Sequence, residues 1–211
     1  MTANFDGLAK WYHLLELSTF GLKLDEARFA QIRELADCRD ILLLGDGDGR
    51  FLTKLLKIAP DSRIRSIDAS AEMLKMAAAR LKPADRARVT FERADATSVE
   101  LPAFAYDGVA TLFFLDCFTN TQVETLTHRI ANSLKPGGVW LFADFAIPPN
   151  GVMNIFSRAV TTGLYAFFRW QTGIDARALP DSETHIARAG LTSVKQSSSV
   201  FGLLRSVAFR R

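Results

Sequence analysis

The feature that most constrains the fold of this chain is a regular alternation of short apolar runs with amphipathic stretches. The apolar runs have the length and composition of strands and cover residues 40–45, 62–68, 88–96, 106–116 and 138–145. Helical spacing of apolar residues marks stretches between them, at 49–59, 70–81 and 120–134. Because strands that alternate with such helices build a parallel sheet covered on both faces, the sequence predicts an α/β, doubly wound, Rossmann-like fold.

The C-terminal part breaks this alternation. Residues 181–190 have the pattern of a short helix, and residues 192–200 and 203–210 alternate in polarity as strands do. Only Phe201 and Gly202 separate these two strands, which is close enough for an antiparallel hairpin. We therefore expect a seven-stranded sheet of five parallel strands followed by this hairpin.

Composition argues against several classes of protein. The formal net charge of +3 is small and spread along the chain, so it does not indicate a nucleic-acid-binding protein. Cys38 and Cys117 have neither the number nor the spacing of a disulfide framework or a zinc site. The longest apolar run, residues 109–115, is too short to span a bilayer, and the first residues lack the pattern of a secretion signal. We therefore expect a cytoplasmic protein.

The loop after the first strand, Gly45-Asp46-Gly47-Asp48-Gly49, combines glycines with carboxylates. A glycine loop between a strand and a helix lies at the carboxyl edge of the sheet, where open α/β folds bind ligands. In dinucleotide-binding loops the backbone holds an anionic pyrophosphate, which Asp46 and Asp48 would repel. No Gly-Lys-Ser/Thr follows, so the loop is not a P-loop either. The loop therefore favours a ligand that carries positive charge.

Two other interpretations apply to the same loop. A calcium loop of the EF-hand type would need oxygen ligands where Arg50 and Lys57 stand, so this interpretation fails. In the second interpretation Asp46 or Asp48 only caps the following helix, and this alternative stays open.

Two more acidic residues follow later strands. Asp68 ends the second strand, about twenty residues after the glycine loop, where a carboxylate accepts hydrogen bonds from the two hydroxyls of a ribose. Asp95 ends the third strand, where a carboxylate can accept from an exocyclic amine such as adenine N6. Either aspartate alone is weak evidence, because aspartates also start turns. Together with the loop they indicate a nucleoside-containing ligand.

At this point the chain resembles the class I S-adenosylmethionine-dependent methyltransferases. The segments that carry the resemblance are "ILLLGDGDG", "SIDASAEML", "RADAT" and "LKPGG", which look like the family's first, second-strand, adenine and pre-strand-five motifs. The resemblance covers residues 40–144 and is closest to small-molecule enzymes of the quinone and natural-product type. It implies S-adenosylmethionine as cofactor and S-adenosylhomocysteine as product.

The resemblance also implies roles in cofactor binding. The backbone at Gly45, Gly47 and Gly49 would approach the methionine and ribose parts, and Asp68 would bind the ribose. The further expected contacts are Ala69 and Met73 beside the adenine, Asp95 with Ala96 at the adenine edge, and Phe113. One position departs from the family, because Leu43 stands where an acidic residue is usual. We expect Asp46 or Asp48 to supply that missing negative charge.

The parts outside the motifs divide the single domain, residues 1–211, into four expected regions. These are an N-terminal helical lid (1–39), the cofactor-binding core (40–145), a helical substrate insert (146–180), and a terminal helix with the hairpin (181–211). Segments added at the carboxyl edge of such a sheet usually build a substrate pocket. The apolar face of the insert would form a lid over the acceptor; contact with a membrane is the second interpretation.

Two residues are candidates for acid–base chemistry. Asp116, after the fourth strand, would act as a general base or an orienting group, although it is also placed to cap the next helix. His13 in the N-terminal helix is the second candidate, although a lone histidine there is more often a packing residue. The residues expected around the acceptor are Trp11, Tyr12, Phe114, Phe118, Phe145, Tyr165 and Arg169.

The same region argues against rival activities. A metal-dependent site of the catechol type would use Asp116 and Asp144, but Phe145 stands where an amide is expected, so we predict no metal. The sequence lacks the Asp/Asn-Pro-Pro-aromatic loop of nucleic-acid amino-methylating enzymes and the cysteine pairs of RNA cytosine enzymes. We therefore expect methyl transfer to a small, hydrophobic or aromatic acceptor. The alternatives are a non-methylating reaction with the same cofactor, such as a cyclisation or elimination, and a non-catalytic cofactor-binding subunit; the oligomeric state stays open.

Overall fold

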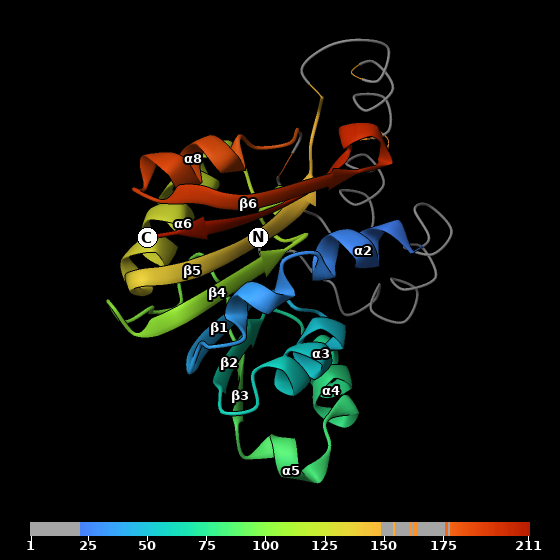
Figure 1. The fold of residues 1–211 in the computed structure, drawn as a ribbon, viewed down its shortest axis with the longest axis vertical. Coiled ribbons are helices and arrows are strands. Elements are labelled where there is room, and N and C mark those ends of the chain that lie inside the picture. Colours follow the sequence, from blue (N-terminus) through green and yellow to red (C-terminus); the bar gives the residue numbers. More distant parts are fainter. Residues whose placement is uncertain (1–21, 149–153, 155–160, 162, 164–175, 177) are drawn as a thin grey trace.

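The computed structural model describes residues 22–148, 154, 161, 163, 176 and 178–211. The strands within these residues form one seven-stranded sheet in the order β3-β2-β1-β4-β5-β7-β6 (Figure 1). The strands are β1 (Asp40–Leu44), β2 (Arg63–Asp68), β3 (Val89–Arg93), β4 (Tyr106–Leu112), β5 (Leu134–Phe145), β6 (Thr192–Ser199) and β7 (Leu204–Arg210). The first five are parallel to one another, and β7 is antiparallel to both β5 and β6. The predicted doubly wound sheet with its terminal hairpin is therefore confirmed.

Helices cover both faces of the sheet (Figure 1). They are α2 (Lys23–Phe29), α3 (Arg50–Ile58), α4 (Ala71–Arg80), α5 (Pro83–Arg86), α6 (Asn120–Ser133) and α8 (Ser182–Arg188), with short 3-10 turns η1 (Ile32–Leu35), η2 (Leu115–Cys117) and η3 (Val200–Gly202). Successive side chains of a strand point to opposite faces, and β1 shows the result. Ile41 and Leu43 pack with the residues of α2 and α3, whereas Leu42 and Leu44 pack with those of α6 and α8. Two apolar cores therefore enclose β1.

Local sequence signals explain where two of the helices begin. Ser70 caps α4 by accepting a hydrogen bond from the Met73 backbone N–H at 3.2 Å, as its position before the helical pattern predicts. Thr119 and Gln122 form a capping box at the start of α6. The N-cap of α6 is thus Thr119, so Asp116 does not serve as the cap of that helix.

Three strands differ clearly from the expected ranges. The expected third strand reaches residue 96, but β3 ends at Arg93, so Asp95 lies in the loop after the strand and does not end it. The fourth apolar run continues to residue 116, but β4 ends at Leu112 because Phe113 takes a left-handed backbone conformation with φ of 55°. This conformation is costly for a bulky residue, and it turns the chain away from the sheet. The fifth strand begins earlier than expected, at Leu134, through an irregular pairing with Tyr106.

The described helices include none that is long and apolar enough to cross a lipid bilayer. Most of the expected N-terminal lid and of the expected insert lies outside the described residues. The division of the domain into a lid, a core, an insert and a terminal hairpin stays a prediction.

Candidate functional site

The glycine loop connects β1 to α3 at the carboxyl edge of the sheet. Gly45 and Gly49 have φ of 67° and 81°, which favours glycine, and neither position has room for a side chain. A Cβ atom on Gly45 would lie 2.3 Å from the Phe114 ring, and one on Gly49 would lie 2.7 Å from the Cα atom of Ala77. Gly47 differs, because its nearest neighbour would be the Met73 sulfur at 3.8 Å. The loop is packed at both ends and open at its middle.

Asp46 lies inside this loop and contacts the following helix. Its Oδ2 accepts a hydrogen bond from the Leu52 backbone N–H at 3.1 Å. Desolvation raises the pKa of the Asp46 carboxyl to about 7, and the charges of Asp48 and Asp68 act in the same direction. The hydrogen bond from Leu52 and the charge of Arg28 oppose this shift. Asp46 thus binds a backbone N–H in the first turn of α3, although the N-cap residue of that helix is Gly49, and its carboxyl can change charge near neutral pH.

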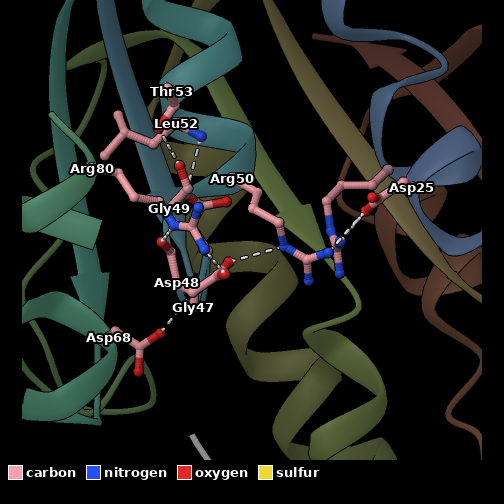
Figure 2. A network of polar contacts seen from close by, with 11 residues as sticks. Asp25, Gly47, Asp48, Gly49, Arg50, Leu52, Thr53, Asp68 and Arg80 are labelled. Atoms are coloured by element: carbon pink, nitrogen blue, oxygen red, sulfur yellow. Dashed lines mark hydrogen bonds and ion pairs between the residues drawn. The ribbon is translucent and has the colours of Figure 1, made fainter. Parts of the chain in front are cut away.

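Asp48 is in a different environment. Its Oδ1 accepts from Arg50 Nε at 3.1 Å, and its Oδ2 accepts from Arg80 Nη2 at 2.6 Å (Figure 2). Arg80 Nε also donates to the Asp48 backbone carbonyl at 2.8 Å. Desolvation acts to raise the pKa of the Asp48 carboxyl, but the two guanidinium groups outweigh it and hold that pKa below its usual range. The charge of Asp48 is therefore already neutralised by arginines.

The arginines extend this contact into a row of alternating charges that we call the ionic chain: Arg28, Asp25, Arg50, Asp48 and Arg80. Asp25 Oδ1 accepts from Arg28 Nη1 at 2.6 Å and from Arg50 Nη1 at 3.3 Å. Figure 2 shows Arg50 between the two aspartates. Arg28 and Asp25 lie on α2, and Arg80 lies at the end of α4. Asp48 belongs to the glycine loop, and Arg50 is the first residue of α3. The ionic chain thus joins three segments around the glycine loop.

Asp68, the last residue of β2, and Asp95, two residues after the end of β3, lie at the same edge of the sheet. Asp68 Oδ2 accepts from the Gly47 backbone N–H at 3.2 Å, and its Oδ1 accepts from that of Ser70 at 2.9 Å. Asp68, the residue expected to bind the ribose, thus lies against the open middle of the glycine loop (Figure 2). Asp95 Oδ1 accepts from the backbone N–H and the hydroxyl of Thr97, at 2.8 and 2.7 Å. Asp95 therefore also forms the turn that strand-terminal aspartates commonly make.

The residues expected beside an adenine differ in exposure. Met73 and Ala96 are buried, at 6% and 7% exposure, whereas Ala69 is exposed. Met73 lies next to Gly47, so its thioether forms an apolar wall beside the open middle of the loop.

Aromatic side chains from the ends of β4 and β5 pack against the glycine loop. The Phe114 ring lies on Gly45 and meets the Phe118 ring edge-on, with 5.0 Å between the centroids. Phe113 meets Phe145 in the same manner at 5.5 Å. The Arg28 guanidinium lies 5.5 Å from the centre of the Phe113 ring. Four residues expected to contact the cofactor or the acceptor are thus gathered at one edge.

Asp116 lies in η2, beside Asp144 at the end of β5. The backbone N–H of Asp116 donates to Asp144 Oδ2 at 3.1 Å, and the two side-chain carboxyls are hydrogen-bonded to each other. The Cys117 thiol lies 3.6 Å from Asp116 Oδ1, and burial raises the pKa of this thiol well above its usual range. Cys117 is therefore a packed thiol and not a nucleophile. No group of three His, Cys, Asp or Glu side chains that could hold a metal ion occurs in the part of the chain that the structure describes.

Sequence reasoning missed some of these residues, and other expectations stay untested. Arg28, Asp25 and Arg80 belong to no recognisable motif. They come together with the glycine loop only through the packing of α2 and α4. Five expected residues lie outside the described residues: Trp11, Tyr12, His13, Tyr165 and Arg169.

The chain is similar to known methyltransferases in both sequence and structure. Residues 41–138 match the family model described as a methyltransferase domain. The chain is 30% identical to the ubiquinone/menaquinone biosynthesis C-methyltransferase UbiE of Syntrophotalea carbinolica over 202 residues, which cover 92% of this chain and 83% of that protein. The protein of the same name from Rubrivivax gelatinosus is 27% identical over 213 residues, which cover 94% and 82%. The N-methyltransferase NodS from Bradyrhizobium japonicum, solved with S-adenosylhomocysteine, has a TM-score of 0.62 at 19% identity and covers 96% of this chain and 98% of that chain.

Proposed function

The chain belongs to the class I S-adenosylmethionine-dependent methyltransferases, and from this premise we propose that its acceptor is a small, hydrophobic or aromatic molecule. The observation that carries the proposal is the aromatic packing at the glycine loop. Phe114 lies directly on Gly45, and Phe118 extends the aromatic surface from it. Apolar and aromatic walls recognise acceptors of matching character. The names of the two quinone-biosynthesis relatives support an aromatic, quinone-like acceptor.

The residues present fit the cofactor of this family. The open side of Gly47 lets a ligand approach the backbone, and Asp68 lies against that opening. A carboxylate has about four lone-pair sites in two oxygens, so Asp68 can accept from ribose hydroxyls besides its two backbone donors. Asp95 and the buried Ala96 follow β3 and would meet the adenine edge.

Asp46 is the better candidate for the negative charge that Leu43 does not provide. Two arginines neutralise Asp48, whereas Asp46 has a backbone N–H as its partner. A cofactor that carries an ammonium and a sulfonium would stabilise the ionised form of Asp46. Bound S-adenosylmethionine supplies an activated methyl group, and the chain's own task is to hold that group in line with the acceptor. Phe113, Phe114 and Phe145 would exclude water there and set the acceptor's position.

A binding and transfer assay tests this proposal. Binding of S-adenosylhomocysteine is measured by calorimetry, and transfer of a radiolabelled methyl group is measured against hydroquinones, phenols, aliphatic amines and transfer RNA. We expect binding of S-adenosylhomocysteine and methylation of the hydroquinones or phenols. Methylation of only the amines or the RNA would overturn the proposed acceptor class.

A pair of phenylalanine variants sharpens the assay. Phe114→Ala removes the ring that lies on Gly45, so we expect about a tenfold higher KM for an aromatic acceptor. Phe104→Ala is the matched control, because Phe104 is 55% exposed and precedes β4 at the opposite edge of the sheet. An equal effect of both substitutions would contradict an acceptor site at Phe114.

A further inference from the structure

Asp144 is a buried carboxyl held in place by the backbone. Only 2% of the residue is exposed. Its Oδ1 accepts from the Phe145 backbone N–H at 2.9 Å, and its Oδ2 accepts from that of Asp116 at 3.1 Å. These two bonds fix the Asp144 side chain at the ends of β4 and β5. The carboxyl of Asp116, on the neighbouring η2 turn, is hydrogen-bonded to it.

Two touching carboxyls in a desolvated place cannot both ionise, so the pair shares one proton near neutral pH. Burial and the charge of Asp116 raise the pKa of Asp144 well above its usual range. Burial also raises the pKa of Asp116, to about 6, but hydrogen bonds from Cys117 and Asp144 oppose that rise. Asp144 is also the more deeply buried of the two, since 2% of it is exposed whereas Asp116 is only half-buried, so the proton stays on Asp144, which donates to an ionised Asp116.

The charged groups on the neighbouring elements do not change which of the two aspartates holds the proton. They are Asp68 at the end of β2, Arg28 of α2 and Arg205 of β7. Arg205 lies opposite Asp144 in the ladder, but it is hydrogen-bonded to Glu183 of α8. Arg28 forms an ion pair within α2. Both cations already have carboxylate partners, and Asp68 adds negative charge, which favours retention of the proton.

We propose that Asp144 is a positioning residue that keeps its proton and holds Asp116 as the general base for an acceptor whose reacting atom carries a proton. This inference rests on the proposed methyl transfer and narrows the acceptor to a phenol- or enol-type hydroxyl or an acidic C–H group. Asp116 lies two residues from Phe114 and two from Phe118, so the base stands next to the aromatic acceptor wall. An acceptor without such a proton would have no use for a base there.

The proton and electron balance of the step is complete without a further reactant. The Asp116 carboxylate takes the proton from the acceptor atom, which forms its bond to the methyl carbon. The carbon–sulfur bond breaks, and its electron pair stays on sulfur, which becomes neutral. One positive charge on sulfur and one negative charge on Asp116 disappear together, and Asp116 then loses its proton to water.

A titration of the wild-type protein tests the protonation state without an acceptor. Aspartate labelled with carbon-13 at the carboxyl is followed by NMR between pH 4 and 9, with S-adenosylhomocysteine bound. Signals of the pair are assigned with Asp116→Asn and Asp144→Asn, and the exposed Asp61→Asn serves as a matched control. We expect one carboxyl to stay protonated above neutral pH and the other to titrate near pH 6. Ordinary acidic titration of both carboxyls would overturn the proposal.

Kinetics test the positioning role, with 1,4-naphthohydroquinone as the probe in single-turnover assays at saturating cofactor. Asp144→Ala removes the hydrogen bond to Asp116, so the acid limb of the pH–rate profile should move up by about one to two pH units. Asp144→Asn keeps a side-chain N–H donor, so its limb should stay near that of the wild type. Asp116→Asn should lose at least about 100-fold in rate. Affinity for S-adenosylhomocysteine should be the same in all three variants.

The outcomes separate this inference from the proposed function. If the profile of Asp144→Asn shifts as far as that of Asp144→Ala, donation from Asp144 is contradicted. A wild-type protein that binds S-adenosylhomocysteine but methylates no hydroquinone or phenol would overturn the acceptor class, while the titration would still decide the state of the pair. If Asp144→Ala does not fold, the wild-type titration and the Asp144→Asn variant decide.

Discussion

The raised pKa of Asp46 makes a quantitative prediction about stability. Above pH 7 the native protein must carry a charge at a desolvated position, whereas the unfolded chain ionises this carboxyl near pH 3.8. Asp46→Asn removes the charge and keeps a carbonyl oxygen that can accept from the Leu52 N–H. We expect this variant to be more stable than the wild type at pH 8, although the side chain lies in the candidate cofactor site.

The magnitude and the pH window follow from the two pKa values. Between pH 3.8 and about 7 the native state binds more protons at Asp46 than the unfolded state does, so stability falls as pH rises. The slope is about 1.4 kcal/mol per pH unit, and the shift of roughly three units sets a ceiling of about 4 kcal/mol. The advantage of Asp46→Asn should therefore be near zero at pH 4, grow through pH 6, and reach about 2 to 4 kcal/mol at pH 8.

Urea unfolding of the cofactor-free protein at pH 4, 5, 6, 7 and 8 measures this difference. Asp48→Asn is the control with the opposite sign, because Arg50 and Arg80 hold the pKa of Asp48 low. That low pKa contributes stability at neutral pH that is lost on acidification, so Asp48→Asn should destabilise most at pH 7 to 8. A stability difference between wild type and Asp46→Asn that does not change with pH would refute the reasoning. The Asp46→Asn variant should also bind S-adenosylmethionine less tightly, with a smaller loss for the sulfur-neutral product.

Two further substitutions test the local structure around the site. Gly49→Ala places a Cβ atom 2.7 Å from the Ala77 backbone at φ of 81°, so it should destabilise the protein by at least about 2 kcal/mol. The Cβ atom of Gly47→Ala meets no atom within 3.4 Å, so this variant should cost only the backbone strain of about 1 kcal/mol. Thermal unfolding of both variants checks this order, and equal melting temperatures would contradict it. Thr119→Ala removes the capping box of α6 and should cost about 1 kcal/mol in urea unfolding, with Thr125→Ala on the exposed face of α6 as the control.

The fold could be predicted from the sequence because its signals are local. The apolar runs, their spacing and the caps such as Ser70 each depend on a few neighbouring residues, and the structure confirms the strands and the hairpin. The early end of β4 could not be read from its pattern. In the sequence, Phe113 and Phe114 simply continue the apolar run of β4. The turn at Phe113 goes with contacts to Phe145 and Arg28, which lie far away in the sequence.

The polar contacts of the candidate site show the same limit. The loop glycines and Asp68 directly follow or end parallel strands. Because the carboxyl ends of neighbouring parallel strands lie at one edge of the sheet, the order of the strands is enough to bring these residues together. The different states of Asp46 and Asp48 could not be predicted, because they depend on Arg80, which lies 32 residues from Asp48. The pairing of Asp116 with Asp144 likewise depends on the shared edge of β4 and β5.

The ionic chain has a consequence for recombining this protein with its relatives. A chimera joined between α2 and β1 would inherit Asp25 and Arg28 from one parent and Arg50 from the other. Unless both parents carry the same alternation, such a graft would remove the Asp25 contact of the partly buried Arg50 and leave it with Asp48 alone beside the glycine loop. Exchange of the N-terminal segment should therefore succeed when α3 and α4 are taken from the same parent. The three helices α2, α3 and α4 would then have to be exchanged together, although strands lie between them in the sequence.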